Sequence, residues 1–521
     1  MLAAENDALP KAKVGGIGDV LRDLPPALVE LGCRVTVIIP GYGHLSAQPG
    51  AQALATFPVS FAGSTRQVVL YSVPTRPGYA ASVQVRHWVV EHPLFSLCGP
   101  GHLYCDDPPG RPFARDATKF AFFCAAAAEL LVQGHCEMPE VIHLHDWHTA
   151  FFLLLRRCRS RYWPLQSVRC VFTIHNLALQ GVRPLDDDPS SLAKWFPDVN
   201  YPHALVADPR WPQCMNPMAT AIRLADAVHT VSPSYAREIL HPSDVEARGY
   251  YGGEGLERDL MQAQAQDRLH GILNGCNYAD NYPVDWHWSD VVQLLNRQIL
   301  AWVGRSAQVA SCHFIALNQL NRWRTRRPET VMTSIGRLTS QKFRLLIQPC
   351  TDGRSALEHL LDGLGEQGVL ILLGQGDPEY RQFFTEIAGQ RGNFLFLYGY
   401  SDTVSQALYH CGDLFLMPSS FEPCGISQML AMRAGQPCLV RDVGGLHDTV
   451  SHGVNGFVFS GDSLSEQAEH LVMTVHEALK LRRNYPERWH DIVHNAAAAR
   501  FLWSDSAQAY IKQLYGGAGP R

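Results

Sequence analysis

Short runs of apolar residues alternate along the chain with segments of helical pattern. The runs are three to six residues long, contain many β-branched and aromatic side chains, and end at glycine or a polar residue. Helix formers fill many of the gaps, as at 119–132 and 428–434. Strands that alternate with helices predict α/β domains with parallel sheets. The predicted strands lie at 34–39, 141–145, 171–174, 227–231, 331–335, 369–373, 394–398, 414–417 and 438–440.

The stretch 414–450 contains the most informative unit of this kind. The strand at 414–417 is followed by the loop Pro-Ser-Ser-Phe-Glu-Pro-Cys-Gly-Ile-Ser-Gln, a helical segment that stops at Gly435, and the strand at 438–440. In such a unit the strand delivers its loop to a helix amino terminus, where free N–H groups attract anions and hydroxyl oxygens. We therefore expect the amides of residues 424–427 to bind a ligand.

Glu422 lies in the same loop and supplies a carboxylate that can accept hydrogen bonds from a polyol. Gly425 leaves room for close approach, and Gly444-Gly445 repeats the pattern one strand later. Two adjacent loops are therefore predicted to open on one cleft. The alternative for Glu422 is an N-capping carboxylate with no ligand-binding role.

A second glycine loop lies near the amino terminus, where Lys13-Val14-Gly15-Gly16 follows a short strand end. The helix after this loop has an apolar face and is expected to be interrupted at Pro25-Pro26. A plain tight turn is the alternative to an anion-binding loop. Because the sequence begins inside its first strand, we expect a weakened edge of the amino-terminal sheet.

Three strands of the first half end in polar and aromatic residues, which predicts chemistry at the carboxyl edge of a sheet. One of them contributes His143, His145 and His148, which could be read as a metal site. However, His143 and His145 would share one strand face, and no cysteine stands at ligand spacing. We interpret them as hydrogen-bonded structural groups.

The pattern divides the chain into two α/β halves that would face each other across a cleft. Residues 277–329 are irregular, with several tryptophans and a basic run at 322–327, and the strands resume at 330. We predict an amino-terminal domain at 1–276, an interdomain connection at 277–329, a second domain at 330–495, and a carboxyl-terminal helix at 496–521 that crosses back to the first domain.

Composition narrows the possible functions. The 521 residues are 46% hydrophobic and 18% charged, as in a soluble globular protein of two to three domains. The 44 Lys and Arg against 49 Asp and Glu give a net charge of -5, which argues against a general nucleic-acid-binding protein. No apolar run approaches the roughly 18 residues of a membrane helix, and the amino terminus has no basic-then-apolar signal. Neither nucleic acid nor a membrane is therefore an expected partner.

The 14 cysteines are scattered from Cys33 to Cys438, with no C-x-x-C pair and no metal-finger spacing. This distribution is typical of buried reduced thiols in a cytosolic protein. We therefore expect reduced cysteines and a cytoplasmic location.

Six motifs occur in order between Glu5 and Val450, and together they resemble the motif series of bacterial glycogen synthases and plant starch synthases. The resemblance covers 277–329 and the last segment only loosely. It implies the GT-B fold, in which two facing Rossmann-like domains hold the active site in the cleft between them. The motifs are Lys13-Val14-Gly15-Gly16, His145-Asp146-Trp147-His148, and the segments 173–181, 230–239, 336–342 and 421–428.

The resemblance implies a retaining hexosyltransferase that moves glucose from ADP-glucose, with UDP-glucose as the other donor to consider, to the non-reducing end of an α-1,4-glucan. No metal and no organic cofactor are implied. Arg337 and Lys342 would bind the diphosphate through charge-assisted hydrogen bonds. On domain closure, which excludes water, Lys13 would complete the phosphate and acceptor contacts. Ordinary surface charge is the alternative reading of Arg337 and Lys342.

The resemblance also assigns the sugar contacts. Asp146 and His175 would meet the donor glucose, with His175 near its 6-hydroxyl, and Glu422 would hold other glucose hydroxyls. Tyr400 would lie against the nucleotide base. The implied catalytic residues are Lys13, Asp146, His175, Arg337, Lys342 and Glu422. The implied substrate-binding residues are Glu5, Gly15, Gly16, Asp19, Trp147, Asn176, Tyr400, Cys424, Gly425, Ile426 and Ser427.

Three departures from the family pattern point toward lower activity. The glycine usual after the catalytic lysine is Phe343, which would reshape the phosphate loop. The usual Asn-Gly-Val-Asp is Asn274-Gly275-Cys276-Asn277, and the spacer between Glu5 and Lys13 is longer than in common members.

Three other functions compete with the synthase. One is a related transferase with a small sugar or sugar phosphate as acceptor. Another is a degenerate, non-catalytic glucan-binding homologue, which Phe343 and the short start would favour. The most remote is a phosphorylase that uses pyridoxal phosphate, for which no cofactor-bearing lysine stands out.

Overall fold

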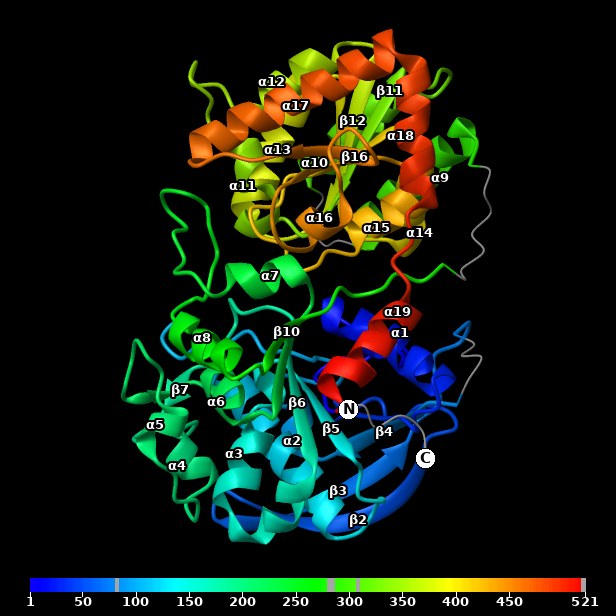
Figure 1. Ribbon diagram of the computed structural model, residues 1–521. Coiled ribbons are helices and arrows are strands. Elements are labelled where there is room, and N and C mark those ends of the chain that lie inside the picture. The colour runs from blue at the N-terminus through cyan, green and yellow to red at the C-terminus, as the bar shows by residue number, and fades with distance from the viewer. Residues whose placement is uncertain (80–83, 279–285, 306–309, 517–521) are drawn as a thin grey trace. The chain divides into compact units, whose positions relative to one another are not determined.

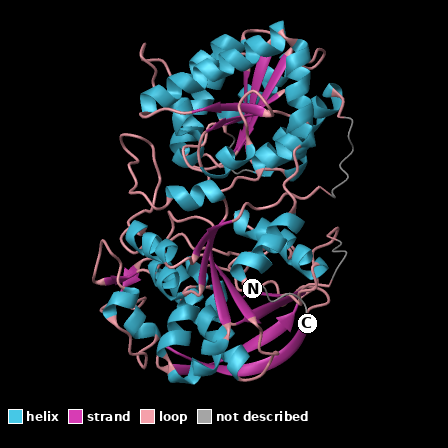
Figure 2. Ribbon diagram, in the orientation of Figure 1, coloured by secondary structure: helices cyan, strands magenta, loops and turns pink. Residues whose placement is uncertain are grey.

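The computed structural model describes residues 1–79, 84–278, 286–305 and 310–516. The chain divides into two compact units, each with its own sheet and helices (Figures 1 and 2). Among the described residues, none of the helices combines the length and apolar character that a membrane span requires. Unit 1 consists of Met1–Ser243, Gly252–Gly275 and Leu502–Arg521, and unit 2 consists of Asp244–Tyr251 and Cys276–Phe501.

The sheet of unit 1 combines two groups of four strands, in the orders β2-β3-β4-β1 and β5-β6-β9-β10. Leu2 joins the groups, because it forms parallel bridges with both Ile38 and Leu144. The expectation that the first residues lie at a sheet edge is therefore wrong: they lie in its middle. The strands are β1 (Thr36–Pro40), β2 (Gln52–Phe61), β3 (Ser64–Ser72), β4 (Arg86–Glu91), β5 (Val141–His145), β6 (Arg169–Ile174), β9 (Ala227–Thr230) and β10 (Leu269–Gly271), with β7 (Arg183–Pro184) and β8 (Cys214–Met215) as a separate pair.

The first helix of unit 1, α1 (Gly16–Glu30), continues through Pro25 and Pro26, which corrects the predicted interruption. Pro26 lacks the N–H that would bond to Arg22 O, and the Tyr79 hydroxyl donates to that carbonyl instead, at 2.8 Å. The other helices of unit 1 are α2 (Ala114–Val132), α3 (Phe151–Cys158), α4 (Leu192–Trp195), α5 (His203–Val206), α6 (Pro217–Leu224), α7 (Pro233–Glu238), α8 (Glu257–Ala265) and α19 (Trp503–Ala509), with short 3₁₀ turns at Pro93–Ser96, Trp147–Thr149 and Ser160–Ser167.

The sheet of unit 2 is entirely parallel and has the strand order β13-β12-β11-β14-β15-β16. Numbered from β11, this is the 3-2-1-4-5-6 order of a Rossmann sheet, so the prediction of a Rossmann-like α/β domain in this half of the chain is confirmed. Every residue of β12 is buried, as expected for a strand with helices on both faces. The strands are β11 (Thr330–Ile335), β12 (Gly368–Gly374), β13 (Phe394–Tyr398), β14 (Leu414–Met417), β15 (Cys438–Arg441) and β16 (Gly456–Phe459).

Residues 277–329, predicted to be irregular, contain two helices, α9 (Trp288–Arg305) and α10 (Ser311–Arg322). Their apolar positions recur at helical spacing and pack on the sheet of unit 2, with Val291, Leu295 and Ile299 in one cluster with β12 residues. Positions 279–285 and 306–309 of this segment lie outside the described residues. The other helices of unit 2 are α11 (Ser340–Ile347), α12 (Ala356–Leu364), α13 (Pro378–Gln390), α14 (Asp402–Cys411), α15 (Ser427–Arg433), α16 (Gly444–Thr449), α17 (Leu464–Asn484) and α18 (Pro486–Ala498).

The carboxyl-terminal segment packs in unit 1, where α19 lies beside α1 (Figure 1). A π-helical turn at Tyr510–Leu514 follows α19. Tyr510 and Tyr515 are buried beside the strand histidines His143 and His229. Residues 517–521 of the predicted helix lie outside the described residues.

Candidate active site

Two loops of unit 2 meet where its strand order changes direction. β11 and β14 are adjacent, and the loops that follow their carboxyl ends lead into α11 and α15. In open α/β sheets, ligands bind outside the strand carboxyl ends at this point. Hydrogen bonds tie the loops together, because Ser420 N donates to Gln341 O at 2.8 Å and Gln341 Nε2 donates to Phe421 O at 3.0 Å.

Lys342, in the first turn of α11, forms an ion pair with the Glu422 carboxylate. The side chain of Lys342 is 18% exposed and that of Glu422 is 9% exposed, so the pair is shielded but reaches the surface. Arg337 is exposed and makes no ion pair within the described part of the chain. The N-cap of α15 is Ile426, which excludes N-capping of this helix as the role of Glu422.

Glycines allow the Glu422 loop to approach the next loop of the sheet closely. Gly445 N donates to Glu422 O at 3.1 Å, and a Cβ on Gly445 would lie 2.2 Å from Cys424 O. Gly425 has φ +76°, and Gln428 Nε2 donates to its carbonyl at 3.0 Å. The loop geometry is therefore set by glycine. Among the predicted contacts here, Cys424 is buried, whereas Ile426 and Ser427 are half-buried.

Arg441 stabilises the Glu422 loop through hydrogen bonds, a role that the motifs do not reveal. It is 6% exposed, and its guanidinium donates to Ser420 O at 2.6 Å and to Gly249 O at 3.0 Å. Gly249 belongs to the 244–251 segment, which packs with unit 2 although its chain neighbours belong to unit 1. An arginine at the end of a buried strand is the only signal in the sequence, and it does not identify the partner 192 residues earlier.

Phe343, the departure from the family pattern, points into the core of unit 2. It is 2% exposed, and its ring packs edge-to-face on Phe384 at 5.7 Å. The ring also supports the turn after β11, because a Cβ on Gly336 would lie 3.3 Å from it. Tyr400, predicted to meet the nucleotide base, is 55% exposed after β13, and its hydroxyl donates to the Asp402 carboxylate.

In unit 1, Asp146 and His175 come from neighbouring parallel strands and meet at their carboxyl edge. His175 N donates to Asp146 Oδ1 at 2.7 Å. Asp146 has φ +55°, an uncommon conformation for a residue with a side chain and one that is concentrated at functional sites. Burial raises the pKa of the Asp146 carboxyl to about 7, so its charge changes near neutral pH.

The histidines His143, His145 and His175 of this edge are hydrogen-bonded to neighbouring side chains. His143 bonds to the Tyr515 hydroxyl at 2.8 Å and to Thr173 Oγ1 at 2.6 Å, which confirms its structural role. His145 Nδ1 lies 2.9 Å from His175 Nε2. Burial lowers the pKa of His175 to about 3, so the ring is neutral. Across the described ranges, no three His, Cys, Asp or Glu side chains are placed to hold a metal ion.

The glycine loop at the start of α1 is held by Glu5. This residue is 2% exposed, and its Oε2 accepts from Val14 N at 2.7 Å and from Gly15 N at 2.6 Å. Its Oε1 accepts from the Tyr104 hydroxyl at 2.6 Å. The Gly15 amide is thus already bonded, which corrects the expectation that it is free for an anion. Glu5 shapes the loop from inside and is not an open binding surface.

Lys13 is exposed beside this loop and donates to Asp19 Oδ1 at 2.6 Å. Gly16, the first residue of α1, is also exposed. Lys13, Gly16 and the exposed Val14, with the half-buried Asp19, are the part of the loop that a ligand can reach.

Trp147, predicted to contact substrate, is 2% exposed and packs edge-to-face with Phe113 and Phe120. Gly181 closes over its ring, since a Cβ there would lie 2.1 Å away. Direct substrate contact by Trp147 is therefore not supported. Asn176 is half-buried, and its side chain accepts from Ala178 N at 2.9 Å.

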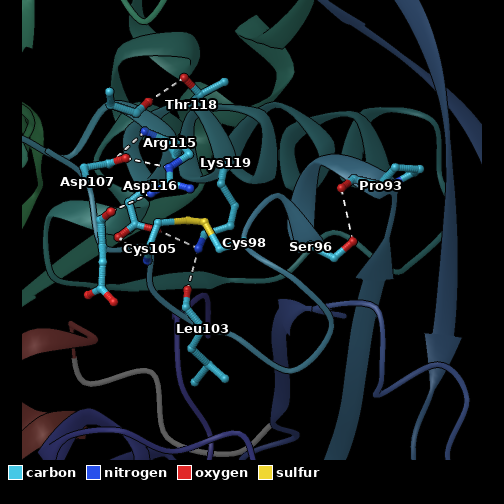
Figure 3. The surroundings of a disulfide bond; sticks show 12 residues. Pro93, Ser96, Cys98, Leu103, Cys105, Asp107, Arg115, Asp116, Thr118 and Lys119 are labelled. Carbon is cyan, nitrogen blue, oxygen red and sulfur yellow. Dashed lines mark hydrogen bonds and ion pairs between the residues drawn. A yellow bond between two sulfur atoms is a disulfide. The ribbon is translucent and has the colours of Figure 1, made fainter. Parts of the chain in front are cut away.

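A disulfide between Cys98 and Cys105 closes the loop that carries Tyr104, with Cα atoms 5.7 Å apart (Figure 3). The expectation that every cysteine is a reduced thiol is therefore wrong for this pair. The buried Lys119 holds the same loop by donating to Leu103 O and to Asp116 Oδ1. The other twelve cysteines form no disulfide.

Sequence comparisons give two matching family models and a set of full-length relatives. Residues 1–262 match the starch synthase catalytic domain, and residues 319–492 match glycosyl transferases group 1. A glycogen synthase of Streptococcus sanguinis (strain SK36) is 34% identical over 529 residues, which cover 98% of each chain. One of Desulfitobacterium hafniense (strain DSM 10664 / DCB-2) is 30% identical over 536 residues, which cover 98% of this chain and 97% of that protein.

Two solved structures are similar to the whole chain. The catalytic domain of starch synthase IV from Arabidopsis thaliana, bound to ADP and acarbose, has a TM-score of 0.74 and 27% identity, and the match covers 100% of this chain and 99% of that one. A sucrose-phosphate synthase from Thermosynechococcus elongatus has a TM-score of 0.55 and 17% identity, and the match covers 99% of this chain and 97% of that one. The second likeness concerns the fold alone.

Proposed function

Because the chain belongs to the glycogen and starch synthase family of glycosyltransferases, we propose that it is a hexosyltransferase that transfers glucose from ADP-glucose to the non-reducing end of an α-1,4-glucan with retention of configuration. The observation that carries the proposal is the Lys342–Glu422 pair, which lies at the switch point of a Rossmann-ordered sheet. ADP is the proposed nucleotide because the starch synthase IV structure is bound to ADP.

The donor diphosphate is the proposed ligand of the β11 and β14 loops. Arg337 offers a planar fork for two phosphate oxygens, and Lys342 offers a compact positive charge. Both charges stabilise the leaving group most as it departs, which is the condition for lowering the barrier. The diphosphate competes with Glu422 for Lys342, so its binding frees the carboxylate to accept from glucose hydroxyls.

Asp146 and His175 are the proposed contacts of the donor glucose in unit 1. During transfer the bond from C1 to the phosphate oxygen breaks, and a bond from C1 to the acceptor 4-hydroxyl oxygen forms on the same face. The departing phosphate takes the hydroxyl proton, so no pair of catalytic carboxylates is needed. Lys13 and Gly16, two exposed residues of the glycine loop, are proposed to contact the phosphate and the acceptor.

The direct test measures ADP release by the purified chain with ADP-glucose and glycogen, followed by separation of the glucan products by length. We expect turnover and longer chains. The Lys342→Ala variant should lose about 10² or more in kcat, as other preorganised charge donors do. Lys480→Ala is the matched control, because Lys480 is an exposed lysine on α17 of the same unit.

Each other outcome points to a different function. Release of ADP without longer glucans, but with a small sugar added as acceptor, would identify a transferase with a different acceptor. No turnover with ADP-glucose, UDP-glucose or any other nucleotide glucose, together with glucan binding that Lys342→Ala leaves unchanged, would contradict the proposed activity.

A further inference from the structure

His145, at the end of β5, is a buried residue that faces the proposed sugar-binding histidine. It is fully buried, and its backbone is fixed by a hydrogen bond from its N–H to Leu2 O at 3.1 Å. Its ring stacks on His143, with centroids 4.3 Å apart. Of its two ring nitrogens, Nδ1 has a hydrogen-bond partner among the described residues, which is His175 Nε2 at 2.9 Å. His145 Nε2 has no hydrogen-bond partner among the residues that the structure describes.

Two proton arrangements fit a hydrogen bond between two neutral imidazoles. In one, His145 Nδ1–H donates, and the unpaired Nε2 of His145 is a bare acceptor. In the other, His175 Nε2–H donates, and His145 keeps a buried N–H at Nε2 with no acceptor. A buried donor without a partner is the rarer and costlier defect. The first arrangement is therefore favoured. Burial lowers the pKa of both rings, which keeps both neutral.

We propose that His145 is a positioning residue that donates from Nδ1 to His175 Nε2 and so fixes the His175 proton on Nδ1, from which it points to a sugar hydroxyl oxygen. His175 Nδ1 is the ring nitrogen that no described residue binds, and His175 is half-buried. The inference rests on the proposed role of His175 in glucosyl transfer. It adds to that role that His145 determines which ring nitrogen of His175 carries the proton.

Asp146 completes the support of His175. Its carboxylate accepts from His175 N at 2.7 Å, so the ring of His175 is held by the last residue of β5 and its backbone by the residue that follows β5. Fixing both leaves His175 little freedom to rotate or to exchange tautomers. A sugar hydroxyl bound by this fixed N–H donor is already in the geometry of the reaction, so no reorganisation is needed. The effect is therefore larger on kcat than on substrate affinity.

Kinetics of two His145 variants test the proposal. His145→Leu removes the donor and should lower kcat about 10- to 100-fold, with the KM for ADP-glucose changed less than about threefold. His145→Asn places an amide N–H near the position of Nδ1 and should recover most of kcat. His87→Leu is the matched control, because His87 is a buried strand histidine of unit 1 that bonds to Asn6.

Imidazole ¹⁵N spectra give a readout that does not depend on activity. In wild-type protein labelled with ¹⁵N-histidine, the His175 signals, assigned by their loss in His175→Gln, should show a protonated Nδ1 and a bare Nε2. A protonated Nε2 in the wild type, or a His145→Leu variant with unchanged kcat, would overturn the proposal. If the wild type turns over no nucleotide glucose, the proposed function fails, whereas the spectrum still decides the tautomer even when His145→Leu does not fold.

Discussion

Asp146 combines a positive φ of +55°, a buried side chain and a raised pKa of about 7. In an unfolded chain its carboxyl would titrate near 3.8. Between these values the folded state binds more protons than the unfolded state, so this residue makes stability fall as pH rises from about 4 to about 7. Above pH 7 its contribution is constant. A buried carboxyl group whose ionisation lowers the free energy of unfolding is typical of functional sites.

The Asp146→Asn variant should lose this pH dependence. Relative to the wild type, its free energy of unfolding should increase between pH 4 and pH 8 by up to about 4 kcal/mol, because a shift of three pKa units corresponds to that amount. Urea unfolding at both pH values measures the difference, and titrations elsewhere in the chain cancel. A difference that stays constant with pH would show that Asp146 titrates normally.

At the scale of elements, the strands could be predicted from sequence because apolar β-branched runs between breakers are local signals. The predicted strands at 394–398 and 414–417 coincide with β13 and β14. Helix α1 could not be predicted through Pro25 and Pro26, since the hydroxyl that satisfies Arg22 O comes from Tyr79 in another part of the chain. Helix α9 was missed although Val291, Leu295 and Ile299 recur at helical spacing, because the tryptophans and the basic run at 322–327 gave the whole segment an irregular composition.

The Tyr79→Phe variant should destabilise α1, because it leaves Arg22 O without the hydroxyl that replaces the missing proline N–H. The expected loss is about 1 kcal/mol of unfolding free energy, the usual net value of one hydrogen bond. Chemical unfolding of the variant measures it, with Tyr71→Phe on β3 as the control for loss of a tyrosine hydroxyl in the same unit. Equal stability of the two variants would rule out this bond as the reason that α1 continues.

The Cys98–Cys105 disulfide is a second link that the spacing of the cysteines did not reveal. It closes a short loop whose Tyr104 supports Glu5, and Glu5 holds the glycine loop. A Cys98→Ser variant, or treatment with a dithiol reductant, should lower the unfolding free energy by about 2 kcal/mol through the unfolded-state entropy. It should also speed proteolysis within 98–105. Cys33→Ser is the control, since Cys33 is a free thiol.

At the scale of the whole molecule, the predictable part of the site is the part carried by contiguous motifs. Lys342 and Glu422 are 80 residues apart, but each lies within a few residues after the carboxyl end of a predicted strand, so parallel topology was enough to place them in one region. The supports of the site were not predictable. Tyr104 reaches Glu5 across 99 positions, and Arg441 reaches Gly249 across 192, with no local signal for either partner.

The long-range support by Arg441 leads to a prediction for the whole chain. Arg441, Ser420 and Gly249 all belong to unit 2, so Arg441→Ala should destabilise unit 2 and leave unit 1 unchanged.

Calorimetry measures the stability of the two units, and the transition whose temperature ADP raises belongs to the unit that binds ADP. The variant should lower that transition by several degrees, because two buried carbonyls lose a charged donor. It should also lower kcat, since Ser420 belongs to the Glu422 loop. Arg354→Ala, which removes a surface ion pair with Asp362 in the same unit, should change neither quantity. A variant that shifts both transitions equally would mean that Arg441 stabilises the molecule as a whole and not the donor loop.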